Sequence, residues 1–229
     1  MPYRTDVIYR YDGSFEGLLC CVFEAISQKE LPAAILSGEE AQLSLLEARE
    51  IASDPQKARR VERSIPTKIS REAADLVWKA HLTCLAEREK HILAFLRLGY
   101  RIGPSVMNHL SDDAVNDLNR AVLHLEREAH LFLGFVRFTE SEGALAAAIE
   151  PKNRVLPLIA PHFCDRFSGE TFLIFDRTHG QALVHQGGRG EILPLEAPEL
   201  PPPDEKERFA RDLWRAYHRA VSIGPRENP

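Results

Sequence analysis

Apolar residues recur with two different periods near the start of the chain, and each period predicts one element. Residues 6–12 (DVIYRYD) alternate in polarity and are rich in β-formers, which predicts a strand. Over Phe15–Ile26 the apolar residues recur at steps of three and four, which predicts a helix with one buried face. Between them, Asp12, Gly13 and Ser14 have the chemistry of a turn and a helix cap. We therefore expect a strand, a turn and an amphipathic helix.

The middle of the chain predicts two longer helices and one shorter piece. The first long helix covers residues 71–98, with Ser70 as its N-cap and apolar residues along one stripe. The second is opened by residues 111–113 (SDD) and has a stripe over Val115–Ala129, whose alternating spacing is typical of helix-on-helix packing. Upstream of both, residues 39–52 (EEAQLSLLEAREIA) favour a short helical piece.

Shorter apolar runs follow residue 130 and predict a β-rich region. Residues 128–138 (EAHLFLGFVRF) lead from the second helix into a strand, and the later runs are ALAAAIE, TFLIFD and QALVHQ. The tetrapeptide RTHG between the last two runs is predicted as a hairpin connection, and HQGGRGE as a loop. Residues 160–167 (APHFCDRF) predict a short helix with Pro161 in its first turn.

These elements predict an α+β protein in which helices pack on a small, mostly antiparallel sheet. We expect one domain over residues 1–229, helix-rich over 1–130 and β-rich over 131–195, with a proline-rich linker at 196–204 and a C-terminal helix at 205–222. The chain has 229 residues, of which 44% are hydrophobic and 28% charged. Both values are ordinary for a globular protein with a sizeable core.

Charge and composition limit the classes of partner. The formal net charge is −5, so the surface as a whole does not attract a polyanion, and a nucleic-acid site would have to be a local basic patch. Residues 57–63 (KARRVER) are one basic run, in a region where the pattern defines no clear element. No window approaches the roughly 20 apolar residues of a membrane span. The four cysteines contain no CxxC pair, and we expect a cytoplasmic protein with reduced thiols and no membrane contact.

We predict no metal and no cofactor. His81, Cys84, Arg88 and His91 share a face of the helix predicted at 71–98. Cys84 and His91 are about 10 Å apart along such a helix, whereas zinc ligands converge to about 2.3 Å of one ion. A polar seam between packed helices explains the group better. The Walker A, HExxH and GxSxG motifs are absent from the sequence, so the enzyme classes that they mark have no support.

Three cation-capable residues in the β-rich region are candidates for an anion site. His162 and Arg166 lie one turn apart on one face of the short helix predicted at 160–167. Arg137, in the predicted strand, has apolar neighbours on both faces, and a buried charge needs a partner or a ligand. Two interpretations stay open. Arg137 belongs either to a phosphate site or to an internal ion pair with a carboxylate, for which the candidates are Glu140, Asp165 and Asp176.

Several stretches of the sequence resemble one bacterial family. They are YDGSFEGLLCCVFEA near the start, EAHLFLGFVRF in the middle, APHFCDRF followed by TFLIFDRT, and LWRAYHRAVSI with RENP at the end. The chain is similar over nearly its whole length to DNA-metabolism proteins of uncharacterised activity. These occur beside a radical SAM protein thought to act in DNA modification or repair, and some relatives are fused to a uracil-DNA glycosylase module.

The resemblance implies a DNA-related role without a demonstrated reaction. We expect an accessory protein of DNA repair or DNA metabolism that acts with the radical SAM partner and binds DNA through a local basic patch. The resemblance marks Arg137, Arg166, Arg226 and Asn228 as nucleic-acid-binding residues, His130 and His162 as candidate catalytic groups, and Asp12 and Ser14 as a structural motif. Two alternatives stay open: an enzyme that acts on nucleotides or nucleic acid through His130 and His162, and a protein–protein adaptor. The acidic-proline-glycine motif of the glycosylase module is absent from this sequence, so glycosylase activity is not implied.

Overall fold

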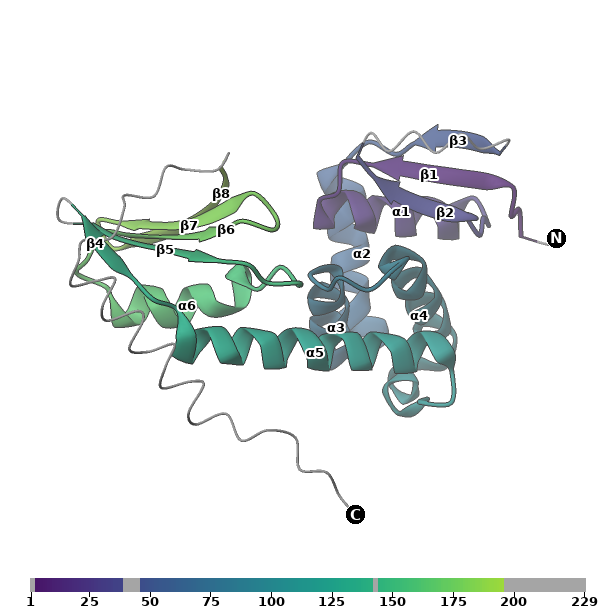
Figure 1. The fold of residues 1–229 in the computed structure, drawn as a ribbon. Helices are drawn as coiled ribbons and strands as arrows, with labels where there is room; N and C mark the ends of the chain where they lie inside the picture. Colours follow the sequence, from purple (N-terminus) through teal and green to yellow (C-terminus); the bar gives the residue numbers. More distant parts are fainter. Residues whose placement is uncertain (1–2, 39–45, 142–143, 196–229) are drawn as a thin grey trace, which may run out of the picture. The chain divides into compact units, whose positions relative to one another are not determined.

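The computed structural model describes residues 3–38, 46–141 and 144–195 and has the predicted α+β fold (Figure 1). The described chain forms two compact units. The N-terminal unit runs to Glu128 and also contains Lys152–Val155, and the C-terminal unit begins with Ala129–Pro151 and resumes at Leu156. Whether the chain folds as one domain stays a prediction.

The N-terminal unit combines a parallel sheet with a group of helices. Its strands follow the order β2-β1-β3, and α1 connects β1 to β2 and packs on one face of the sheet (Figure 1). Its elements are β1 (Val7–Tyr11), α1 (Phe15–Ser27), β2 (Ala34–Ser37), β3 (Glu47–Glu50), α2 (Pro55–Lys68), α3 (Arg71–His81), α4 (Arg88–Ile102), the 3-10 helix η1 (Gly103–Asn108) and the first part of α5 (Asp113–Phe135).

The first strand and helix confirm the sequence prediction, whereas β3 corrects it. Ser14 is the N-cap of α1 and accepts a hydrogen bond from the backbone N–H of Gly17. Residues 47–50 belong to the segment predicted as helical, but they form a strand that pairs with β1. The helical preference of these residues is overridden because β1 offers them a complete row of backbone hydrogen-bond partners. Val7 and Tyr9 of β1 are fully buried.

A buried carboxylate ties the sheet together from the side. Glu30 accepts hydrogen bonds from the Tyr9 hydroxyl and, at 2.9 and 3.0 Å, from two nitrogens of the Arg49 guanidinium. Burial and the contact with Glu30 raise the pKa of Tyr9. The arrangement links β1 to β3 through side chains as well as through the backbone ladder, and the bidentate geometry is among the stronger forms of hydrogen bond.

The helix predicted at 71–98 is two helices, α3 and α4, because the chain breaks at residues 82–87. Ser70 caps α3 as expected, by accepting from the N–H of Ala73. At the break, the N–H of Cys84 donates to Oδ1 of Asn153 and the carbonyl of Thr83 accepts from Arg88. These tertiary partners replace the helical hydrogen bonds, so the periodicity continues while the helix does not. The polar group predicted on one helix face is therefore divided between two helices.

Helix α5 corrects the prediction for residues 128–138. Its buried stripe confirms the expected one, with Val115, Leu118, Leu125 and Ala129 at most 5% exposed. The helix then continues to Phe135, so most of EAHLFLGFVRF is helical, and the strand β4 begins only at Thr139. The helical periodicity of α5 continues to Phe135 and no proline interrupts it. These residues are therefore helical, although their bulky apolar side chains suggested a strand.

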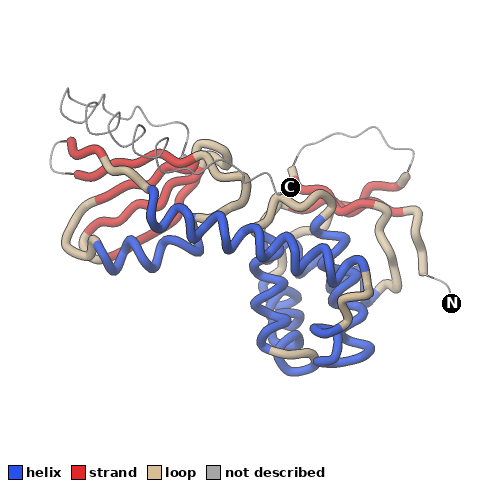
Figure 2. The backbone as a smooth tube through the Cα atoms, turned by 60° about the horizontal axis from the view of Figure 1, so that its bottom comes forward, coloured by secondary structure: helices blue, strands red, loops and turns tan. Residues whose placement is uncertain are grey.

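The C-terminal unit is a five-stranded sheet with α6 against one face (Figure 2). Its strand order is β4-β5-β6-β7-β8, and only the β5–β6 pair is parallel, which confirms a mostly antiparallel sheet. RTHG joins β6 to β7 as predicted. The elements are β4 (Thr139–Ser141), β5 (Ala144–Ile149), α6 (Leu156–Arg166), β6 (Phe172–Asp176), β7 (Gln181–Gln186) and β8 (Arg189–Pro194).

Two further predictions concern the ends of this unit. Helix α6 begins at Leu156, so Pro161 lies inside it and not in its first turn as predicted. The linker at 196–204 and the helix at 205–222 lie outside the described residues, as do Arg226 and Asn228. Within the described residues, the helices are too short or too polar to traverse a lipid bilayer.

His81, at the end of α3, is buried without a partner for one ring nitrogen. It is 7% exposed, its ring centroid lies 5.4 Å from that of Phe15, and its Nδ1 has no hydrogen-bond partner among the described residues. Burial, together with the charges of Arg88 and Arg154, lowers its pKa from 6.5 to about 4. The folded protein therefore holds this histidine neutral.

We expect His81 to make the protein less stable in acid. The folded pKa lies below the unfolded value, so the stability linked to the neutral ring is complete above pH 6.5 and is lost as the pH falls toward about 4. The loss amounts to about 3 kcal/mol. Denaturant unfolding across this range should show a weaker pH dependence for His81→Phe than for the parent. His109→Gln, which changes an exposed histidine of the same unit, should behave like the parent. Equal slopes for His81→Phe and the parent would contradict the assignment.

Candidate functional site

The residues predicted for an anion or catalytic site in the β-rich region lie on the surface of the C-terminal unit. His130 is exposed on α5, and Arg137 is exposed between α5 and β4. His162 and Arg166 are both exposed and lie one turn apart on α6. Arg137 is exposed, unlike the buried position that its apolar neighbours predicted, and both interpretations of it stay predictions. Catalysis by His130 and His162 stays a prediction.

Aromatic packing brings the segment of Arg137 to α6. The ring of Phe138 lies 5.8 Å from that of Phe163 and 5.1 Å from that of Phe167. Phe163 directly follows His162 in the sequence, and Phe167 directly follows Arg166. Edge-to-face rings at such distances are a stable arrangement. These aromatic contacts hold the segment of Arg137 against the segment that carries His162 and Arg166.

Asp12 and Ser14 form a polar clasp at the carboxyl end of β1. Asp12 accepts from the N–H and hydroxyl of Ser14 at 2.9 and 2.7 Å, and from the hydroxyl of Ser53 at 2.6 Å. Burial raises the pKa of Asp12, but these hydrogen bonds outweigh it and the net shift is downward. Ligands of parallel sheets bind at this kind of edge. Here the groups satisfy one another, so we assign them a structural role.

A cluster of cationic side chains lies elsewhere in the N-terminal unit, on the exposed face of α2. This helix buries Ala58, Val61 and Ile65 and turns its other face to solvent. A hollow of about 570 Å³ runs along that face. Its lining is polar and strongly cationic, and consists of Gln56, Arg59, Arg60, Arg63, Ser64, Thr67 and Lys68. Glu62, the single acidic residue of α2, is not part of the lining.

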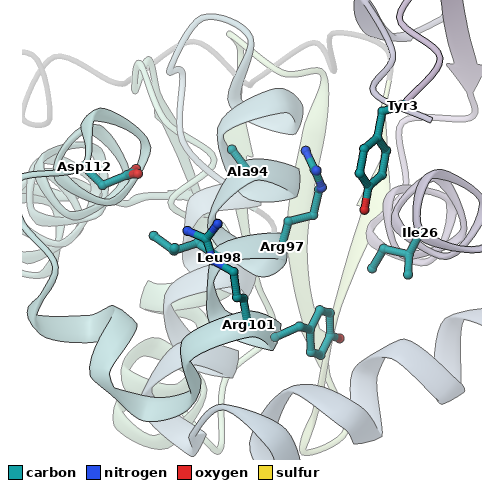
Figure 3. A pocket seen from close by; sticks show the side chains of 8 residues that line it. Tyr3, Ile26, Ala94, Arg97, Leu98, Arg101 and Asp112 are labelled. Atoms are coloured by element: carbon teal, nitrogen blue, oxygen red, sulfur yellow. The ribbon is translucent and has the colours of Figure 1, made fainter. Parts of the chain in front are cut away.

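A second hollow, also of about 570 Å³, lies beside α4 and has a different lining (Figure 3). Aromatic and aliphatic side chains alternate there with charged ones: Tyr3, Ile26, Ala94, Arg97, Leu98, Tyr100, Arg101 and Asp112. Figure 3 shows Tyr3 and Ile26 on one side, with the side chain of Arg97 extending toward Tyr3. The guanidinium carbon of Arg97 lies 4.4 Å from the centre of the Tyr3 ring, which is a cation–π contact.

The two hollows meet at Tyr100. Its ring lines the α4 hollow, its hydroxyl lies 2.6 Å from the hydroxyl of Ser64 in the α2 hollow, and Nζ of Lys68 lies 6.0 Å from its ring centre. Close packing makes this possible, because Gly99 lies against Ile69 at the end of α2, and a Cβ on Gly99 would come within 2.6 Å of that side chain. We call the combined lining the α2–α4 surface.

The α2–α4 surface carries cations whose charge is not neutralised locally. Within residues 3–38, 46–141 and 144–195, no ion pair involves any of its six arginines and lysines, which are Arg59, Arg60, Arg63, Lys68, Arg97 and Arg101. The acid of the lining, Asp112, uses its Oδ1 to accept from the N–H groups of Ala114 and Val115 and so caps α5. In a chain with a net charge of −5, such a surface is a local exception.

Side chains that commonly bind metals do not cluster among the described residues. Across the described ranges, no three side chains of histidine, cysteine, aspartate or glutamate gather closely enough to hold an ion. His91 and Asp117, the nearest approach of a histidine on α4 to an acid, are 3.8 Å apart and form a weak polar contact between helices.

The chain matches a known protein family. The profile of a domain of unknown function, DUF4130, matches residues 86–229. The chain belongs to this family. A search of curated proteins found no match.

The DUF4130 match divides the α2–α4 surface. Arg97, Tyr100 and Arg101 lie inside the matched residues, together with α5 and the whole C-terminal unit. Tyr3 and the cations of α2 lie outside them, as does the clasp at Asp12. The α2–α4 surface therefore consists of a part within the residues matched to the DUF4130 domain and a part that precedes them.

We expect the clasp to serve stability. Ser14→Ala should lower the free energy of unfolding by about 1 kcal/mol, because α1 loses its N-cap and Asp12 loses a donor. Ser27→Ala, which removes a hydroxyl near the other end of the same helix, provides the comparison. Thermal or denaturant unfolding measures both. A Ser14→Ala protein as stable as Ser27→Ala would refute the structural role.

Proposed function

We propose that the protein binds nucleic acid through the α2–α4 surface and serves as an accessory protein in DNA metabolism. The observation that carries the proposal is the set of six cations without local ion pairs around two adjoining hollows. Lysine and arginine side chains that neutralise phosphates release counterions, and this gain supplies much of the affinity of proteins for nucleic acid.

The distribution of charge supports a local site. An overall net charge of −5 repels a polyanion from most of the molecule, so attraction concentrates where cations outnumber acids. On α2, Arg59 and Arg63 are one turn apart and both exposed, and Arg60 lies 5.6 Å above the ring of Phe23. A row of cations along one face of a helix is the usual electrostatic footprint of a nucleic-acid-binding protein.

The cellular role is proposed from the resemblance given above. It supports action in DNA repair with a radical SAM protein as the partner, in the cytoplasm, and the membership of DUF4130 is compatible with it without naming an activity. The surface proposed here differs from the one expected from the sequence. Arg137 and Arg166 remain a rival patch on the C-terminal unit, and the experiment below includes them.

The test compares three sets of full-length variants in binding to a short labelled DNA duplex. Arg59→Gln/Arg63→Gln changes the α2–α4 surface, Arg137→Gln/Arg166→Gln changes the rival patch, and Arg120→Gln is a control at an exposed arginine of α5. We expect only the first to weaken binding, by a similar factor for unrelated sequences. It should also flatten the slope of log K against log salt by about 1.8 if both arginines contact phosphates.

Each outcome has a definite meaning. Loss of binding in Arg137→Gln/Arg166→Gln, with Arg59→Gln/Arg63→Gln unchanged, would move the site to the C-terminal unit. Equal small losses in all variants, including Arg120→Gln, would show an effect of net charge without a site. A parent protein that binds neither single-stranded nor duplex DNA, alone or with its partner protein, would end the nucleic-acid proposal.

A further inference from the structure

The α4 hollow differs from the α2 hollow in a way that identifies the kind of nucleic acid. We infer that it receives an unstacked base, while the cations of α2 hold the adjoining phosphates, so that the preferred ligand is single-stranded nucleic acid. This inference rests on the proposed function and adds the class of ligand to it. It is carried by the lining of the α4 hollow, by the contact between Arg97 and Tyr3, and by the junction at Tyr100.

The lining of the α4 hollow suits a flat, partly apolar group. Tyr3 and Ile26 are 43% and 42% exposed although both are large hydrophobic residues. Together with Arg97 they line a hollow of about 570 Å³, a volume within the range of small-ligand sites (Figure 3). Phosphate alone gives no reason to leave such side chains in contact with water. A nucleobase does, because its face is apolar and its edge is polar.

The contact between Arg97 and Tyr3 forms a stacking platform. The guanidinium carbon is 4.4 Å from the ring centre, close enough for the two groups to form one continuous surface. Single-stranded bases stack on aromatic rings and on arginine planes, and every base has a face that can do so. The platform therefore predicts affinity without strong sequence preference.

The polar groups of the α4 hollow match the edge of a base. Arg101 offers donors, and the carboxylate of Asp112 offers an acceptor whose position is fixed by the cap of α5. The α2 hollow has neither an aromatic ring nor a large aliphatic side chain in its lining. Its donors fit phosphate oxygens. Because the two hollows meet at Tyr100, a strand whose backbone follows α2 has a place for a base directly beside it.

A duplex cannot use both hollows at once. Its bases are stacked and paired inside the helix, and a base can enter the α4 hollow only after it has left the stack, which costs free energy. A single strand has no pairing to break. The same six cations therefore favour the single strand over the duplex when the base contact is added to the phosphate contacts.

The experiment separates the base contact from the phosphate contact with three labelled oligonucleotides of equal length: oligo(dT), an abasic strand with the same number of phosphates, and a duplex. Full-length parent protein should bind oligo(dT) about tenfold more tightly than the abasic strand, which corresponds to one stacked base. Tyr3→Leu should remove this difference without changing the salt dependence. Tyr3→Phe, which keeps the ring, should retain it.

A second variant protects the test against a folding defect at Tyr3. Ile26→Glu puts a carboxylate into the α4 hollow from an exposed position on α1, and it should weaken oligo(dT) binding more than abasic binding. If the parent binds all three ligands equally and neither variant discriminates between them, the base site is wrong while phosphate binding stands. If the parent binds none of them, the proposed function itself fails.

Discussion

The close approach of α4 to the end of α2 depends on the missing side chain of Gly99. This glycine is buried, and a methyl group in its place would come within 2.6 Å of the Ile69 side chain. Ile69 is the C-cap of α2. Its contact with Gly99 therefore fixes the position of the next turn of α4. Tyr100 follows directly and thereby reaches Ser64 and Lys68. One steric constraint thus aligns two helices that are remote in sequence, and their surface properties become a single feature.

The apolar stripes of the two helices explain why the cationic residues lie on the outside. Each helix has to bury its own apolar stripe, Ala58, Val61 and Ile65 on α2 and Ile92, Phe95 and Leu96 on α4. The polar positions left over are then forced to the outside. Elsewhere in the unit, charged side chains pair across elements, as Lys57 does with Glu24 and Lys79 does with Glu126. The α2–α4 surface is distinguished by the absence of such pairs among the described residues.

Local signals were sufficient wherever an element is stabilised by its own neighbours. The first strand, the Ser14 cap and the stripes of α1 and α5 could be predicted because each depends on periodicity or on a side chain within three residues. The break after His81 could not, because its hydrogen bonds are supplied by Asn153, far along the chain. Nor could β3, whose pairing with β1 is a tertiary event.

The candidate site was missed for a related reason. KARRVER was visible as a basic run, but its partner is a set of residues on α4 and one tyrosine at residue 3. No spacing rule connects them, since the contact depends on Gly99 and on the fold of α1 beneath. One signal was available. Ile26 extends the apolar stripe of α1 by one turn beyond Val22, and a stripe that runs past the core is a reason to look for a surface contact.

The return of residues 152–155 to the N-terminal unit has a consequence for how the protein is made. Asn153 supplies the acceptor for Cys84, and its own amide and side chain donate to Glu128, while the N–H of Arg154 donates to the carbonyl of Leu82. During synthesis, the backbone groups at the break between α3 and α4 therefore stay hydrogen-bonded to water until residues 152–155 have left the ribosome. Domains usually complete folding in the order in which they are translated. Here the first unit to be synthesised is completed only after part of the second has emerged.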